Sequence, residues 1–359
     1  MMNFLKILFI TAIITFFNCC NRVDNINNID LTSLLKADST VINLEDISES
    51  IKIVPLQMTD SSIISYISDV KFDGSYLYVL DKNTCKVFNS EGKYIRSIGF
   101  KGRAINEYLY INEVFVNPKN IILFDDSGKK LLIYSLEGEY LYTLPINDIK
   151  GATQVYTLDE ENYMAFTPDM GQEHSDNMLT FFNSKGITDS ILYNNPLKVP
   201  CNANIYIKEC QLLKYGNDLK IKLLFNDTIF SLNLNNKKLS PCYILNLGKK
   251  KAVPDARIDM MNSFYNGGIP ERYNQMSKVI LLGENNSTIL MKVDNEYFFY
   301  NKLNQKLNKW FLLPPLSTEY ENSKGLSKIY TLDEAGYLIS YVENTDENSN
   351  PIIILAKLK

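Results

Sequence analysis

Two stretches of the chain repeat one pattern at a spacing of about 45 residues. Residues 76–99 read YLYVLDKNTCKVFNSEGKYIRSIG, and residues 121–144 read IILFDDSGKKLLIYSLEGEYLYTL. Each copy contains an apolar run, an Asp-containing turn, a second apolar run, a Glu-Gly turn and a third run. Such a period is typical of architectures in which every repeat is one supersecondary unit. The repeat therefore constrains the fold before any catalytic motif is considered.

The first hairpin of this repeat recurs along the whole chain. Its copies lie at residues 70–80, 114–124, 155–166, 212–224, 279–293 and 329–342. Each copy has two strand-like runs around a short turn that contains Gly, Asn, Asp or Pro, which is the pattern of a β-hairpin. A second hairpin follows each of the first five copies. Two hairpins make a four-stranded unit, the size of one propeller blade.

The sixth copy lacks its fourth strand, because only PIIILAKLK follows its first hairpin. The strand-like segment at 50–58, SIKIVPLQM, has no partner of its own near the start of the chain. We expect it to pair with residues 351–358, which closes the ring and removes the open sheet edges. The sequence thus predicts an all-β fold, a six-bladed β-propeller over residues 41–359, with a helical or loop insert at about 248–275.

Composition agrees with a β fold and excludes one class of partner. The 23 Tyr and 18 Phe residues favour strands over helices. The formal net charge is −4. Nucleic-acid binding needs a basic stripe that displaces counterions from phosphates, so we expect no nucleic-acid partner.

The N-terminus has the features of an export signal. Lys6 precedes the apolar run Ile7–Phe17, which as a helix is only about 16 Å long and too short to cross a bilayer. A cysteine at the end of such a signal is typical of bacterial lipoproteins, whose cysteine carries the lipid. Cys20, with Cys19 as the alternative, is the expected lipid attachment site; a plain secretory signal remains the other interpretation. We expect residues 1–20 to be the signal peptide and residues 21–40 a polar tether, which places the protein in the cell envelope, facing the periplasm or the cell surface.

The other cysteines and the one histidine do not form a metal-binding pattern. Cys85, Cys201, Cys210 and Cys242 form no CxxC pair. His174, the single histidine, lies in a polar loop. Structural zinc sites need four such ligands, so we expect no metal and no cofactor. A disulfide between Cys201 and Cys210 is one option in an oxidising compartment, and the sequence leaves it open.

One segment also carries a resemblance to a known family. Residues 76–108, YLYVLDKNTCKVFNSEGKYIRSIGFKGRAINEY, resemble the six-bladed β-propeller lipoproteins of Bacteroidetes, which are themselves similar to NHL-repeat propellers. The residues that match the family pattern after the third strand are Gly99, Gly102, Glu107 and Tyr108. The resemblance extends from about residue 41 to the C-terminus and implies a fold and a compartment. It implies little about activity.

Two kinds of residue are candidates for a functional role. Asp81, Asp125 and Asp126 follow strand ends at matching repeat positions, where we expect them to accept hydrogen bonds from turn N–H groups. Two long connections, at 192–206 and 248–275, interrupt the short-turn pattern, and such connections are commonly lids, binding loops or packing inserts. A helix that only packs over the ring is one interpretation of the second connection, and a lid that contacts a ligand is the other. The candidate ligand-binding side chains are Tyr206, Tyr265, Arg272 and Tyr273.

Two function classes are compatible with the sequence. The first is a monomeric, non-catalytic binding or scaffolding lipoprotein whose partner is a glycan, a peptide or an envelope protein. The second is a propeller hydrolase or lyase with its active site at the central channel. The sequence contains no nucleophile elbow, phosphate loop or HExxH motif, so it identifies no catalytic residue and favours the first class.

Overall fold

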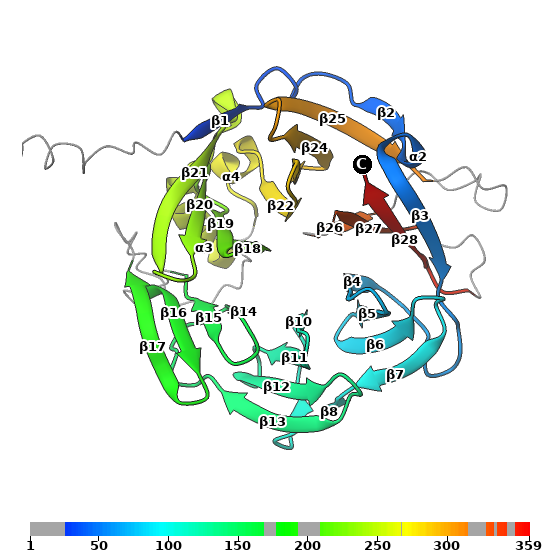
Figure 1. Ribbon diagram of the computed structural model, residues 1–359. Helices are drawn as coiled ribbons and strands as arrows, with labels where there is room; N and C mark the ends of the chain where they lie inside the picture. Colours follow the sequence, from blue (N-terminus) through cyan, green and yellow to red (C-terminus); the bar gives the residue numbers. More distant parts are fainter. Residues whose placement is uncertain are drawn as a thin grey trace, which may run out of the picture.

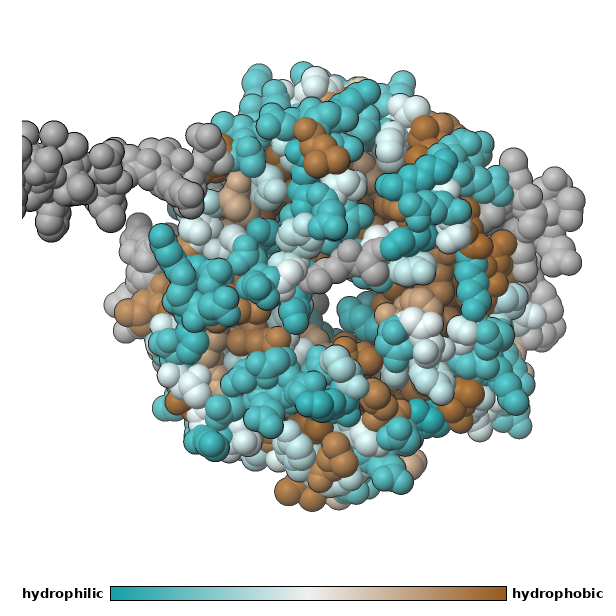
Figure 2. Space-filling view, in the orientation of Figure 1, coloured by the Kyte–Doolittle hydropathy of each residue, from teal (hydrophilic) through white to brown (hydrophobic). Residues whose placement is uncertain are grey.

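The computed structural model describes residues 26–168, 177–192, 209–266, 268–314, 328–333, 336–342 and 349–359. Their strands form a ring of six blades (Figure 1). Figure 2 shows that the centre of the ring remains open as a channel. The six-bladed propeller predicted from the repeat is therefore confirmed.

Each blade is an antiparallel sheet whose strands follow one another outward from the channel. Blade 1 consists of β4 (Ile67–Phe72), β5 (Tyr76–Asp81), β6 (Thr84–Asn89) and β7 (Tyr94–Ile98). Blade 2 consists of β10 (Glu113–Val116), β11 (Asn120–Asp125), β12 (Lys130–Ser135) and β13 (Tyr140–Pro145). Blade 3 consists of β14 (Gln154–Thr157), β15 (Tyr163–Phe166), β16 (Asn177–Asn183) and β17 (Gly186–Leu192). Blades 4 and 5 consist of β18 (Cys210–Tyr215), β19 (Asp218–Leu223), β20 (Thr228–Asn233) and β21 (Lys238–Asn246); and β22 (Val279–Glu284), β23 (Thr288–Val293), β24 (Glu296–Asn301) and β25 (Lys306–Leu313). Blade 6 consists of β26 (Lys328–Leu332), β27 (Tyr337–Val342), β28 (Ile352–Leu358) and β3 (Ser48–Pro55).

The ring closes through the N-terminal strand, as expected from the incomplete sixth copy. β3 pairs antiparallel with β28, with Pro55 opposite Ile352 and Ile53 opposite Ile354. Near the channel the innermost strands of blades 5 and 6 also touch, at Gly283 and Leu332. A Cβ atom at Gly283 would lie 1.9 Å from the Leu332 carbonyl oxygen, so this contact requires glycine.

The core lies between the blades, because every blade packs both of its faces against a neighbour. The middle strands of a blade are buried on both sides, and their sequences are continuous apolar runs. An example is the NIILFD sequence of β11, where every residue is buried. The described residues form one apolar cluster at each of the six blade interfaces. The cluster between blades 6 and 1 contains Val54 of β3 together with Val79 of β5. The terminal strand thus completes the core as well as the sheet.

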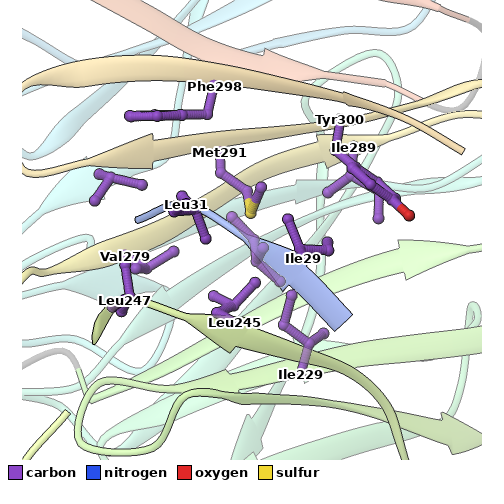
Figure 3. Close-up of a cluster of buried hydrophobic side chains, with 12 residues drawn as sticks. Ile29, Leu31, Ile229, Leu245, Leu247, Val279, Ile289, Met291, Phe298 and Tyr300 are labelled. Carbon is purple, nitrogen blue, oxygen red and sulfur yellow. The ribbon is translucent and has the colours of Figure 1, made fainter. Parts of the chain in front are cut away.

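A short N-terminal belt, residues 26–47, wraps around blades 4 to 6. It contains β1 (Asn27–Asp30), β2 (Thr40–Asn43) and α2 (Leu44–Ile47). β1 adds in parallel to β21, and β2 adds in parallel to β25. Ile29 and Leu31 enter the cluster between blades 4 and 5 (Figure 3). The tether predicted for residues 21–40 is therefore wrong from residue 26 onward, because these side chains are buried in the propeller core.

The two ends of the ring differ in their loops. We call the connection face the end at which the outermost strand of one blade leads to the innermost strand of the next. The opposite end, the hairpin face, carries the turns within the hairpins. Both long connections leave the described ring at the connection face, since one follows β17 and the other follows β21. The other elements on this face are the parallel pair β8 (Phe100–Lys101) and β9 (Glu107–Tyr108), the turn η2 (Gly248–Lys250), and the helices α3 (Asp255–Asn266) and α4 (Glu271–Gln275).

The repeated aspartates hold the connection face together. Asp81 Oδ1 accepts hydrogen bonds from the N–H groups of Ser65 and Tyr66 at 3.0 and 2.9 Å. Asp125 accepts the N–H groups of Leu109 at 2.8 Å and of Gly128 at 2.8 Å. The structural role predicted for these residues is confirmed.

Asp126 differs from its neighbour, because its carboxylate forms an ion pair with Lys129 at 2.6 Å.

Candidate functional site

Those sequence-predicted ligand-binding residues that the structure describes belong to the connection face near blade 4. Tyr206 lies outside the described residues, and so do Cys20, His174 and Cys201. Tyr265 belongs to α3, although its side chain is also outside the described part of the chain. Arg272 and Tyr273 both belong to α4. The structure therefore places the described candidates on the insert between blades 4 and 5.

The two candidates on α4 make contacts within the insert. The exposed Arg272 guanidinium lies 3.8 Å from the Asp255 carboxylate and 3.5 Å from the Asp259 carboxylate, which joins α4 to α3. Tyr273 packs at 6.1 Å between ring centroids against Phe225, which follows β19. Burial raises the pKa of the Tyr273 phenol. These contacts leave the outer side of Arg272 open to solvent and half-bury Tyr273.

The base of the insert is attached to blade 4 by a small apolar cluster and a few hydrogen bonds. The cluster contains four buried residues: Leu224, Phe225, Ala256 and Met276. The Ala252 N–H donates to Asp227 Oδ2 at 2.8 Å, and the Ser277 N–H donates to the Lys250 carbonyl at 2.9 Å. The blade interfaces, by comparison, contain nine to twelve buried residues each. The insert is thus held more weakly than the blades beneath it.

Arg257 joins α3 to the innermost strand of blade 4 through a buried ion pair. Its Nε donates to Glu209 Oε2 at 2.8 Å, and the two residues are 5% and 7% exposed. Glu209 directly precedes β18, and its carbonyl accepts the N–H of Leu224. The two terminal nitrogens of Arg257, Nη1 and Nη2, are buried and have no hydrogen-bond partner in the described structure. A buried donor without a partner is costly, so this half-satisfied guanidinium is unusual for a purely structural group.

A buried lysine and a partly buried aspartate influence each other near the base of the insert. The Lys222 side chain on β19 is 1% exposed, and its Nζ donates to the Leu223 carbonyl at 2.8 Å. Burial lowers the pKa of Lys222 to about 8, against the opposing effect of the Asp227 carboxylate. Burial also raises the pKa of Asp227, whose Oδ1 has no partner in the described residues. Both groups are therefore held closer to neutrality than in water.

The mouth of the channel on the connection face combines exposed tyrosines with charged groups. Tyr66 and Tyr110 precede the innermost strands of blades 1 and 2 and are 57% and 47% exposed, although Asp81 and Asp125 fix their backbones. On blade 6, burial lowers the pKa of Lys328. Asp69 opposes this shift, whereas the charge of Lys292 adds to it. This side of the mouth is therefore aromatic and polar.

Sequence reasoning did not single out Glu209, Lys222 or Arg257 as site residues. One signal was available for Lys222: it occupies a second strand, where blades 1 and 2 place apolar residues such as Leu80 and Phe124. No local signal marks Glu209, because its role arises from the insert that folds over it.

Two negative findings apply to the described ranges only. None of their helices is long and apolar enough to span a bilayer. No three His, Cys, Asp or Glu side chains in these ranges gather closely enough to hold a metal ion. The question of a Cys201–Cys210 disulfide falls outside them.

Two solved structures with the same fold come from Bacteroides species. A Bacteroides fragilis protein described as exported has a TM-score of 0.71 and 16% identity, with 93% of this chain and 100% of that chain covered. A Bacteroides vulgatus member of the DUF4221 family has a TM-score of 0.51 and 12% identity, with 87% and 97% covered. At these identities the likeness shows the fold alone.

The family comparison covers almost the whole propeller. No curated protein matches the chain significantly. The family model described as "Domain of unknown function (DUF4934)" matches residues 26–357, which begins at the N-terminal belt and ends in the closing blade. The chain belongs to the DUF4934 family.

Proposed function

We propose that this protein is a cell-envelope lipoprotein that binds a glycan, peptide or protein partner without turning it over. Its binding surface is the connection face over blades 3 to 5. The observation that supports this proposal is that both long connections leave the described strands at the same end of the ring, on either side of blade 4. Loops at the end of a rigid ring can change in length and sequence without disturbing the strands, so they commonly carry recognition.

Chemistry on the insert supports a binding role. Arg272 is exposed at the junction of the two helices, and Ile269 beside it is 62% exposed. Three exposed lysines, Lys249–Lys251, lead into α3. We assign the contacts to Tyr206, Tyr265, Arg272 and Tyr273, which together offer stacking and charge.

Replacing part of the insert tests this assignment. Residues 255–270 can be exchanged for a short Gly/Ser link, which removes α3 and retains the Ala252–Asp227 hydrogen bond at the base. Partners are first sought with the intact protein on glycan and peptide arrays and by pull-down from envelope extracts. We expect the exchange to abolish binding while the melting temperature changes by only a few degrees.

A matched change on the other side of the ring provides the control. The connection between blades 1 and 2 carries β8 and β9 on the same face, and residues 101–106 can be shortened in the same way. Binding should survive this second change. Retained binding after loss of α3 would remove blades 3 to 5 from consideration, and global unfolding would show that the insert only packs.

The lipid anchor is a separate part of the proposal. The Bacteroides fragilis protein of the same fold, which is described as exported, supports an envelope location, and Cys20 at the end of the signal-like segment is the assigned lipid site. Replacing Cys20 by Ala should move the protein from the detergent phase to the aqueous phase in phase partition. Replacing Cys19 by Ala should leave it in the detergent phase; the reverse result would assign the lipid to Cys19.

A further inference from the structure

Arg257 has donors to offer that the folded chain does not use. An arginine guanidinium carries five N–H donors in a planar fork. One edge of the fork is engaged, because Nε donates to Glu209 at 2.8 Å. The other edge, Nη1 and Nη2, has no partner among the described residues, and both atoms are buried. The side chain is 5% exposed, so water from the bulk does not compensate for the missing bonds.

We propose that the free edge of Arg257 recognises a carboxylate group of the ligand beneath α3. This inference rests on the proposed function and names the chemistry that the insert would select. Two parallel N–H donors match the two oxygens of a carboxylate, which is the arrangement for which arginine is best suited. Glu209 holds the guanidinium in one orientation from the opposite edge, so its geometry is set before the ligand arrives.

The surroundings of Arg257 also favour an anion. Arg257 lies in the first turn of α3, where the partial positive charge of the helix N-terminus adds to its own. The exposed lysines Lys249–Lys251 stand at the base of the insert and would raise the local concentration of anions.

Entry requires α3 to move, because Nη1 and Nη2 are enclosed in the folded protein. The insert is suited to such a movement: its apolar cluster has only four buried residues, and exposed ion pairs join α4 to α3. Opening would break this small cluster and the Arg257–Glu209 ion pair, and closure around the bound carboxylate would restore the pair and supply the partners that the closed insert lacks. Binding energy is thus available to hold the ligand under the helix.

Small acids and their esters test the carboxylate directly in the full chain. The probes are galacturonic acid and N-acetyl-dialanine, each compared with its uncharged methyl ester by isothermal titration calorimetry at matched ionic strength. We expect at least one acid to bind and its ester to fail. Binding of the sugar acid alone would identify a uronic-acid source, and binding of the dipeptide alone a C-terminal peptide source. Equal binding of acid and ester, or no binding of either acid, would overturn the proposal.

Variants of the protein provide the second arm. Arg257→Gln should weaken binding of the acid about 10- to 100-fold, because charge-assisted hydrogen bonds are lost. Arg96→Gln is the matched control, since Arg96 is a part-buried arginine in blade 1 with an unpartnered Nε, far from the insert along the ring. Unchanged affinity in Arg257→Gln would refute the assignment. If that variant does not fold, the comparison of acid and ester still decides.

The outcome is separable from that of the proposed function. If a partner no longer binds when α3 is removed but still binds Arg257→Gln, the proposed binding face stands and only the proposed carboxylate recognition is refuted. If the partner still binds after α3 is removed, the proposed binding face is refuted instead.

Discussion

At the scale of single residues, the connection face depends on a small number of buried acidic groups. Asp81 and Asp125 each accept hydrogen bonds from at least two backbone N–H groups, so a single carboxylate fixes the backbone of the adjoining loop. This role was readable from the sequence, because Asp recurs after the same strand in both copies. The partnership of Arg257 with Glu209 was not readable, since 48 positions separate the two residues and only the folded insert brings them together.

Removing the Asp125 carboxylate should be strongly destabilising. Asp125 is fully buried, and Asp125→Ala leaves at least two part-buried N–H groups, those of Leu109 and Gly128, without their acceptor, which should cost roughly 2–4 kcal/mol. The neighbouring Asp126→Ala breaks only a partly exposed pair with Lys129 and should cost less than about 1 kcal/mol. Urea unfolding of both variants measures the difference. Similar losses of unfolding free energy in the two variants would contradict the role of Asp125 as the acceptor that holds the adjoining loops.

The buried Lys222 side chain should destabilise the folded protein at neutral pH. Its pKa is lowered by burial to about 8, whereas an unfolded lysine titrates near 10.4. The penalty is therefore complete below about pH 8 and disappears as pH rises towards 10.4. We expect Lys222→Met to stabilise the protein by about 1–3 kcal/mol at pH 7, less any attraction to Asp227 that is lost. Unfolding free energies measured from pH 6 to pH 10 should converge for the two proteins, and a constant gap would show that burial does not perturb this amine.

At the scale of elements, the N-terminal belt shows where sequence patterns stop being informative. Its first part, INNIDLTSLLKADST at residues 26–40, is mostly polar and has no strand-like alternation, so the sequence predicts that it belongs to a tether over residues 21–40. Ile29 and Leu31 are nevertheless buried, because the gap between blades 4 and 5 accepts them and β21 offers an unpaired edge. Propensity is a weak guide for such short segments, and tertiary packing decides. The middle strands of the blades, such as β11 and β12, were predictable for the opposite reason: both of their faces are apolar and buried.

A substitution in the belt separates the two interpretations of this segment. Leu31 is fully buried, so Leu31→Ala should cost about 2–4 kcal/mol through lost burial and a cavity. Val41 in β2 is 60% exposed, and Val41→Ala should change stability by less than about 0.5 kcal/mol. Thermal unfolding of both variants tests this. A tether that does not pack would predict no effect from either change.

At the scale of the whole molecule, the fold was predicted by counting the hairpins in the sequence. Six first hairpins, five second hairpins and one unpaired N-terminal segment leave a six-bladed ring as the arrangement without an open blade edge inside the core. The insert could be located but not interpreted, because its function depends on which buried groups it covers. Its helices lie over the connection face, where Glu209 and Lys222 occupy positions that local patterns treat as ordinary strand residues.

Closure of the ring should control the cooperativity of unfolding. A chain that starts at residue 48 lacks β1 and β2 but retains β3, whereas a chain that starts at residue 59 also loses the partner of β28. We expect the first to unfold in one transition at a lowered temperature. The second should unfold at a still lower temperature with a shallower transition, because blade 6 is left with an open edge and Val54 is missing from the core.

Adding the missing strand back in trans makes this prediction specific. A synthetic peptide of residues 48–58 should bind the chain that starts at residue 59 and raise its melting temperature with peptide concentration, as expected for a ligand of the folded state. The same peptide with Val54→Asp should fail, because this side chain is 1% exposed at the interface between blades 6 and 1. Equal melting temperatures for the two truncated chains, or equal rescue by the two peptides, would mean that β3 does not close the ring.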